Sequence, residues 1–161
     1  MARISKFGGT SGSTLTVNLS EKLTINGRDY GSKQTFSIPS IVDVSRRLVT
    51  VTTTEATILS FGAAIGAGTF IVGDVMYLRF SNLDDTNHIV LTFVNENDDE
   101  FAVKLDKGHS FVLVGDVSGG MADMIDAIDG TGLSLSLGDL KTVTADADTA
   151  SADLEIYVAS K

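Results

Sequence analysis

The densest group of possible metal ligands in the sequence is NENDDE, residues 95–100, where four carboxylates and two amides lie between two apolar runs. A calcium loop of the EF-hand type needs oxygen ligands at its first, third and fifth positions, glycine at its sixth and a bidentate glutamate at its twelfth. Counted from Asn95, the sixth position is Glu100 and the twelfth is Asp106. The flanking runs also alternate like strands and not like helices. These departures exclude an EF-hand loop.

A looser cation site is the alternative for the same stretch, with Asn95, Asn97, Asp98 and Asp99 as its candidate ligands. Hard cations accept mixed sets of carboxylate and carbonyl oxygens. Asn and Asp are also typical of turns, because their side chains bond nearby backbone N–H groups and tolerate left-handed geometry. We therefore interpret the stretch as a solvated turn and assign no metal site.

The remaining titratable groups do not form a recognisable catalytic set. Asp84 and Asp85 are adjacent, and adjacent residues of a strand point to opposite faces, so the pair is poorly placed to share a substrate. His88 and His109 have no Gly-x-Ser-x-Gly turn to accompany them. We expect both histidines at the surface, and we predict no catalytic residue, no cofactor and no enzymatic activity.

Composition narrows the class of protein and its partners. The chain has 161 residues, no cysteine, and 12 basic against 21 acidic side chains, for a net charge of −9. This charge opposes binding to nucleic acid and to anionic membranes, so neither is an expected partner. Sixteen glycines with a single proline, among many Thr, Ser, Val and Ile, favour short strands joined by tight turns.

Alternating apolar residues at the start of the chain predict a β-hairpin. Leu15, Val17 and Leu19 alternate with polar residues, and the same alternation recurs just before the dipeptide Asn26-Gly27. Asn-Gly suits a type I′ turn, because both central positions need a positive φ. We expect a return strand over residues 34–38 that ends at Pro39, which cannot donate a ladder hydrogen bond.

The next segment is rich in β-branched residues and is interrupted by Arg46-Arg47. Two adjacent charges cannot both face a core, so this stretch is expected to be either a tight turn or an edge strand. Residues 61–75 hold several glycines without firm periodicity and are expected to form a long irregular loop.

Four short apolar runs with turn residues between them follow, at residues 75–80, 89–94, 101–105 and 111–114. Their regular spacing predicts an antiparallel meander within a sandwich or barrel, with the aromatic residues in the core.

One segment has helical periodicity instead. Met121, Met124, Ile125 and Ile128 lie on one face of a helix, with Gly130 just past its end. Residues 133–137 alternate again as a strand. The acidic stretch that begins at residue 144 is expected to be a loop that leads into a final strand.

These elements together predict an all-β protein, an antiparallel β-sandwich or jelly-roll-like barrel with one short helix. Residues 1–14 are expected to form a flexible N-terminal arm, because they are rich in Gly, Ser and Thr. Residues 15–161 are expected to form a single β-sandwich domain.

Three stretches resemble small structural proteins of tailed-bacteriophage virions, especially of marine and cyanobacterial phages. They are RRLVTVTTTEATILSFG, then YLRFSNLDDTNHIVLTFVNENDDEFAVKLDKGHSFVL, then GDLKTVTADADTASADLEIYVASK, and together they cover about half the chain.

The resemblance implies a capsid decoration or cement protein that stabilises the particle through oligomeric contacts. It implies synthesis in the host cytoplasm, a place in the virion, a homo-oligomeric state, and other virion proteins such as the major capsid protein as partners. The alternative is a receptor- or glycan-binding β-sandwich module of a phage tail or fibre. In that case the turns at residues 82–87 and 95–100 would carry the ligand contacts.

Overall fold

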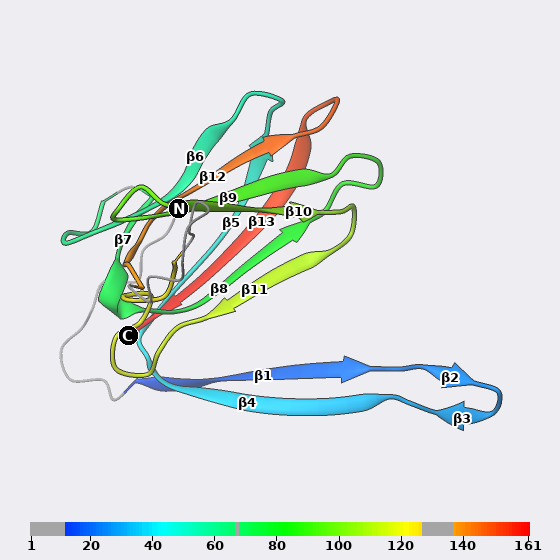
Figure 1. Ribbon diagram of the computed structural model, residues 1–161. Coiled ribbons are helices and arrows are strands. Elements are labelled where there is room, and N and C mark those ends of the chain that lie inside the picture. The colour runs from blue at the N-terminus through cyan, green and yellow to red at the C-terminus, as the bar shows by residue number, and fades with distance from the viewer. Residues whose placement is uncertain (1–11, 67, 127–136) are drawn as a thin grey trace.

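A computed structural model describes residues 12–66, 68–126 and 137–161 of the protein (Figure 1). Two antiparallel sheets pack face to face. One has the strand order β11-β8-β13-β5, and the other has the order β10-β9-β12-β6, with the short β7 parallel to β6. The strands are β5 (Asp43–Val51), β6 (Ala56–Gly62), β7 (Thr69–Ile71), β8 (Val75–Asn82), β9 (Ile89–Asn95), β10 (Glu100–Leu105), β11 (Ser110–Val114), β12 (Leu140–Ala147) and β13 (Ala152–Ser160).

The connectivity is that of a jelly roll. Every connection along the chain from β5 to β13 crosses from one sheet to the other, except those between β6 and β7 and between β9 and β10. Eight strands in two four-stranded sheets with this order confirm the predicted all-β sandwich. The predicted meander is wrong in its pairing, because β8 pairs with β11 and β13 and not with β9.

Aromatic rings fill the space between the two sheets. The ring of Phe93 stacks on Phe101 with centroids 4.9 Å apart, and it meets Phe80 edge-on at 5.8 Å and Phe111 at 5.3 Å. Phe80 and Phe93 are completely buried. These four phenylalanines therefore serve the core, as predicted, whereas Tyr77 lies on the outer face of its sheet against the hairpin.

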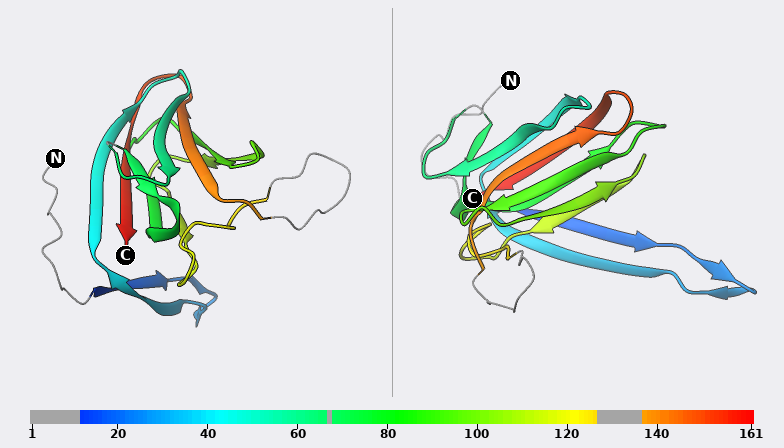
Figure 2. Two further views of the ribbon diagram at one scale, coloured as in Figure 1. Left: turned by 90° about the vertical axis from the view of Figure 1, so that its left-hand side faces the viewer. Right: turned by 45° about the horizontal axis from the view of Figure 1, so that its top comes forward.

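The first strands form a long hairpin that belongs to neither sheet of the sandwich (Figures 1 and 2). Its arms are β1 (Ser13–Glu21) and β4 (Ser32–Ile41), and β2 (Thr24–Ile25) and β3 (Arg28–Asp29) form its tip. Asn26 and Gly27 have φ values of 50° and 78°, which confirms the predicted turn.

Contrary to the prediction, the return strand does not end at Pro39. β4 continues to Ile41. The register of the ladder shifts opposite residues 13–15, and Ser40 has left-handed geometry (φ 64°), so the proline lies in an irregularity of the strand. A bulge leaves a residue outside the ladder, so the missing N–H of Pro39 is tolerated there.

The boundaries at the N-terminus also differ from the prediction. Ser13 and Thr14, assigned to a flexible arm, are the first residues of β1, while residues 1–11 lie outside the described residues. The sandwich itself is built from residues 43–160, and residues 13–41 form a separate two-stranded sheet beside it.

Arg46 and Arg47 lie within β5, which is the edge strand of its sheet, so the edge-strand alternative is confirmed. Their side chains go to opposite faces. The Arg46 guanidinium meets Glu155, whereas Arg47 donates from Nη2 to the carbonyl oxygen of Ile58 in the facing sheet. The loop predicted for residues 61–75 is only partly irregular, since it contains β7 and the 3-10 helix η1 (Val72–Asp74).

The predicted helix that starts at Met121 is wrong over the described residues up to 126, which form turns and isolated bridges. The backbone N–H groups there donate to distant carbonyls: Met121 to Val72, and Met124 and Ile125 to Gly138. The apolar spacing reflects burial of Met121 and Ile125. Ile128, Gly130 and most of the strand predicted for residues 133–137 lie outside the described residues.

Candidate assembly surface

The acidic stretch NENDDE forms the turn between β9 and β10, and its first residue holds the turn together. Asn95 is completely buried. Its Oδ1 accepts hydrogen bonds from the backbone N–H groups of Asn97 and Asp99, both at 2.9 Å, and its Nδ2 donates to Asp99 Oδ2 and to the carbonyl of Ile125.

Of the other three cation candidates, two are exposed. Asn97 is exposed, and the exposed Asp98 places Oδ1 2.5 Å from Lys141 Nζ in an ion pair. Asp99 is half-buried and accepts the hydrogen bond from Asn95. Within residues 12–66, 68–126 and 137–161, no three His, Cys, Asp or Glu side chains are grouped in a way that could hold a metal ion.

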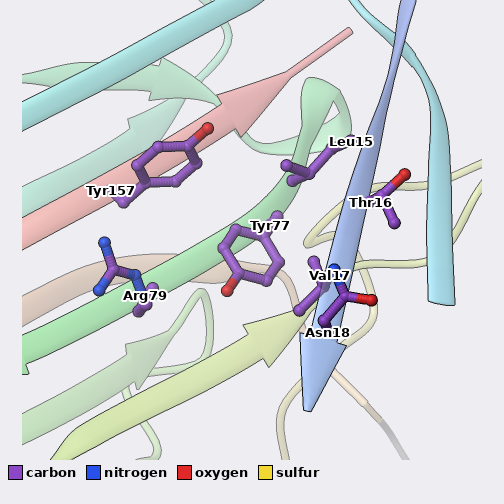
Figure 3. A pocket seen from close by; sticks show the side chains of 7 residues that line it. All are labelled: Leu15, Thr16, Val17, Asn18, Tyr77, Arg79 and Tyr157. Atoms are coloured by element: carbon purple, nitrogen blue, oxygen red, sulfur yellow. The ribbon is translucent and has the colours of Figure 1, made fainter. Parts of the chain in front are cut away.

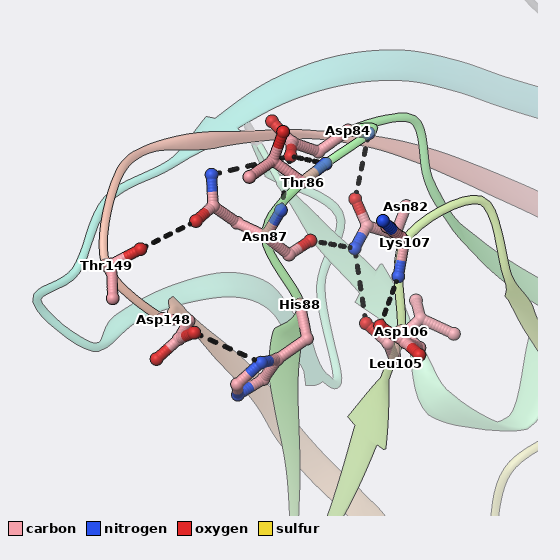
Figure 4. Close-up of polar contacts among 10 residues, drawn as sticks. All are labelled: Asn82, Asp84, Thr86, Asn87, His88, Leu105, Asp106, Lys107, Asp148 and Thr149. Carbon is pink, nitrogen blue, oxygen red and sulfur yellow. Dashed lines mark hydrogen bonds and ion pairs between the residues drawn. The ribbon is translucent and has the colours of Figure 1, made fainter.

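The second polar turn, between β8 and β9, is organised by a buried amide in the same manner (Figure 4). Asn82 Nδ2 donates to the carbonyls of Asn87 and Leu105, at 2.9 and 3.2 Å, and its Oδ1 accepts from the N–H of Asp84. Asp84 Oδ1 in turn accepts from the N–H groups of Thr86 and Asn87, which holds the pKa of Asp84 below its ordinary value.

Neither histidine has a hydroxyl nucleophile among its hydrogen-bond partners. His88 Nδ1 lies 3.4 Å from Asp148 Oδ2, on the loop between β12 and β13 (Figure 4). His109 uses its backbone, which accepts from Asn82 and donates to Asp106. Polar side chains that the sequence points to therefore make hydrogen bonds to backbone groups in the turns at residues 82–87 and 95–100.

A different candidate surface lies on the hairpin, which has one apolar and one polar face. Cross-strand pairing puts Leu15 opposite Ile38 and Val17 opposite Phe36, with Leu19 next along the same face. The other face pairs Thr16 with Ser37, Asn18 with Thr35 and Ser20 with Lys33. Thr35 Oγ1 donates to Asn18 Oδ1 at 2.8 Å on that face.

Within the described residues, only the base of the apolar face is covered. There Ile38 and Ile41 are buried against Met76, Tyr77 and Ala159, with Leu15, Val17 and Tyr157 packed around them. Beyond this contact the hairpin diverges from β8 and β11 and continues past them (Figure 1). Its outer apolar residues are exposed, with Leu19 at 53%; the others are Leu23, Ile25, Tyr30 and Phe36.

A shallow groove of about 200 Å³ marks the place where the two surfaces separate (Figure 3). Leu15 and Val17 point from β1 toward Tyr77 and Tyr157, whose rings meet edge-on with centroids 5.9 Å apart. Arg79 also lines the groove, with its guanidinium carbon 5.7 Å from the centre of the Tyr157 ring.

The outer face of the sheet beyond the groove carries a charged network across three strands. Glu155 accepts from Arg79 Nη2 at 2.6 Å and from Arg46 Nε at 2.7 Å. The bond from Arg46, together with that from Arg79, keeps the pKa of Glu155 below its ordinary value. The network joins β8, β13 and the edge strand β5, so that the sheet is pinned where the hairpin does not cover it.

Exposed apolar residues border this network. Strand pairing puts Leu48 beside Glu155, Val44 beside Ala159 and Val112 beside Arg79, so all three lie on the outer face. Leu48 is 61% exposed, and Val44 and Val112 are exposed as well. Apolar residues are therefore exposed both on the outer half of the hairpin and on the rim of the outer sheet face, and the described part of the chain covers neither.

Charge is also divided unequally between these two parts. The hairpin, residues 12–41, has three basic and two acidic side chains, for a net charge of +1. Residues 42–161 have seven basic and nineteen acidic side chains, for a net charge of −12. The sequence predicts the hairpin but not its exposure, although this contrast in charge is readable from it.

Comparisons with known proteins add little. No family model matches the chain, and no curated protein matches it. A search of solved structures finds a chain from work titled "Bacillus endospore appendages form a novel family of disulfide-linked pili", with a TM-score of 0.40 and 11% sequence identity over 98% of this chain and 97% of that one. Similarity at this level supports no functional conclusion.

Proposed function

We propose that this protein is a structural subunit that is held in an assembly by its projecting hairpin. The observation that carries the proposal is the apolar outer half of that hairpin, from Leu19 to Tyr30, which no other described part of the chain covers. A two-stranded hairpin alone is only marginally stable in water, so long exposed arms of this kind are stabilised by a partner. Exposed apolar residues gathered on one element mark a protein contact.

The particle we propose is a tailed-bacteriophage virion, in which the protein acts as a capsid decoration or cement protein. The resemblance of residues 46–62, 77–113 and 138–161 to virion proteins supports this role. The jelly roll supports it in general terms only, because viral capsid proteins, lectins and cupins all use that fold. The net charge of −12 on residues 42–161 suits a position outside packaged DNA, whose phosphates would repel it.

The test is to locate the protein in particles released from the culture that carries its gene. After density-gradient purification, we expect an antibody against the chain to detect it in the particle band at a fixed ratio to the major capsid protein. Particles that lack the gene should lose their DNA at a lower temperature. Intact, equally heat-stable particles without the protein would contradict a decoration or cementing role.

A second candidate function, glycan or receptor binding, is favoured by the groove beside the hairpin. Tyr77, Tyr157 and Arg79 present aromatic and hydrogen-bonding groups to the same opening (Figure 3). If this groove binds a glycan, Tyr157→Leu should abolish binding on a glycan array. Val117→Ala should leave the binding unchanged, because Val117 does not line the groove.

A further inference from the structure

We propose that the outer half of the hairpin binds the rim of the outer sheet face, at β5 and β11, of a second copy of this chain. The inference rests on the proposed function and names the partner of the hairpin. It predicts a head-to-tail contact, in which each copy contributes one surface as donor and the other as acceptor.

Part of the hairpin's apolar face already packs on the outer face of this sheet within one chain. At the hairpin base, Leu15 and Ile38 already pack on the outer side of the same sheet, against Tyr77 and Ala159. The uncovered remainder of the hairpin face and the uncovered remainder of the sheet face continue outward from that contact. One hairpin cannot cover the rim of its own sheet, because it diverges from β8 and β11 (Figures 1 and 2).

Charge also favours a second copy as the occupant. The hairpin carries +1 and residues 42–161 carry −12, so a hairpin that approaches another copy's sandwich meets the opposite charge. Two hairpins that pack on each other would meet like charge. The outer sheet face also offers Glu155 within its network of arginines, where a lysine from the hairpin could compete for the carboxylate.

A contact of this kind is heterologous, so it does not close with two copies. Repeated, it gives a ring if the rotation between copies closes and an open filament if it does not. In a ring each copy would have its hairpin covered, whereas an open chain would keep an exposed hairpin at one end and an exposed rim at the other.

The experiment uses the absence of cysteine from the natural chain. One copy carries Leu23→Cys and a second, size-tagged copy carries Leu48→Cys, and the two are oxidised separately and as a mixture. We expect a disulfide-linked product in the mixture at least tenfold more abundant than in either copy alone. Leu23→Cys mixed with Val117→Cys is the matched control, because Val117 is exposed at 68% but lies outside β5 and β11, on the loop that follows β11.

Association without cysteines provides the second arm. Leu23→Asp and Leu48→Asp should each weaken self-association at least tenfold by sedimentation velocity, and Val117→Asp should not. A monomer at every concentration, or cross-linking of Leu23→Cys to itself in preference to Leu48→Cys, would overturn the head-to-tail contact. Neither result removes the protein from the purified particle band, so a failure of this inference is distinguishable from a failure of the proposed function.

Discussion

The side-chain amide of Asn95 stabilises the turn between β9 and β10, because it is completely buried and makes four hydrogen bonds. Replacing it by Ala would leave the N–H groups of Asn97 and Asp99 and the carbonyl of Ile125 without this partner. We expect Asn95→Ala to lower the free energy of unfolding by about 3 kcal/mol, since each unsatisfied buried group costs about 1–3 kcal/mol. Urea denaturation measures this loss.

Asn97→Ala is the control for that variant, because Asn97 lies in the same turn but is exposed. We expect a change of less than about 0.5 kcal/mol, as is typical of surface substitutions. Equal losses at both positions would mean that the turn depends on amide side chains in general and not on the buried one.

Glu155 gives the outer sheet face a dependence on pH. The hydrogen bonds from Arg46 and Arg79 lower the pKa of its carboxyl in the folded protein below the ordinary 4.5. A lowered folded-state pKa means that the carboxylate stabilises the fold above its unfolded-state pKa, and that this contribution is lost as pH falls through the folded value. We expect Glu155→Gln to melt at a lower temperature than the natural chain at pH 7, with a gap that narrows as the pH is lowered to 2.5.

Thermal scans of both chains between these pH values measure the difference between their melting temperatures. Taking this difference cancels the effect of titrating the carboxylates that both chains share. A gap between the two melting temperatures that persists undiminished at pH 2.5 would show that Gln disturbs packing and that charge is not the cause.

The turn residues can be recognised from the sequence, but their burial cannot. Asn, Asp and their spacing predict the turns at residues 82–87 and 95–100 through local chemistry. Whether an amide in such a turn is exposed depends on what covers it. The segment that covers Asn95 reaches it through Ile125, thirty residues further along the chain, and no local pattern records that contact.

At the scale of elements, one close approach between segments depends on a glycine without a side chain. Gly120 has a φ of 61°, and a Cβ atom there would lie 2.6 Å from the carbonyl oxygen of Gly73. Gly108, in the turn before β11, has a similar φ of 70° but open space around it. The two positions therefore separate the cost of left-handed geometry from the cost of a backbone clash.

We expect Gly108→Ala to cost about 1 kcal/mol, the penalty of an L-residue in the left-handed region. Gly120→Ala should cost about 1–3 kcal/mol more, because η1 and the turn after β11 would have to move apart. Chemical denaturation of the two variants gives the comparison. Equal losses would show that the segment around Gly73 yields without strain.

The elements that the sequence predicts correctly have a strong local signal, and those that it misses do not. β1 and β13 follow from period-two patterns, the hairpin turn from Asn26-Gly27, and β8 to β11 from short apolar runs between turn residues. β12 was interpreted largely as an acidic loop, because its inward positions include Ala145 and Ala147, which are buried but give little apolar signal. The helix at Met121 was inferred from spacing that tertiary hydrogen bonds override.

At the scale of the whole molecule, the pairing of strands is set by contacts that the sequence does not display. Regular turn spacing suggests that consecutive strands pair, yet β8 is paired with β13, more than seventy residues away. Alternation also cannot say whether an apolar face packs on its own domain or on another molecule. Leu15 and Leu19 have the same type and parity in β1, and only Leu15 contacts the sandwich.

The outer hairpin should therefore be dispensable for folding, although we propose that it makes the assembly contact. Residues 21–32 are exposed throughout, and none belongs to either buried cluster. Ser20 and Lys33 face each other in the ladder, so an Asn-Gly turn can join them directly. We expect this shortened chain to melt within about 2 °C of the natural one, since a change of 1 kcal/mol shifts the melting temperature by about 2–4 °C in a protein of this size.

Ile38→Ala provides the contrast, because Ile38 is buried at the base where the hairpin meets Tyr77 and Ala159. We expect hydrogen exchange to accelerate in β1 and β4 while β13 stays protected, since the loss of this contact frees the hairpin locally and leaves the main core intact. If the shortened chain melted well below the natural chain, the outer arms would be part of the folding unit. Their exposed apolar face would then need no partner.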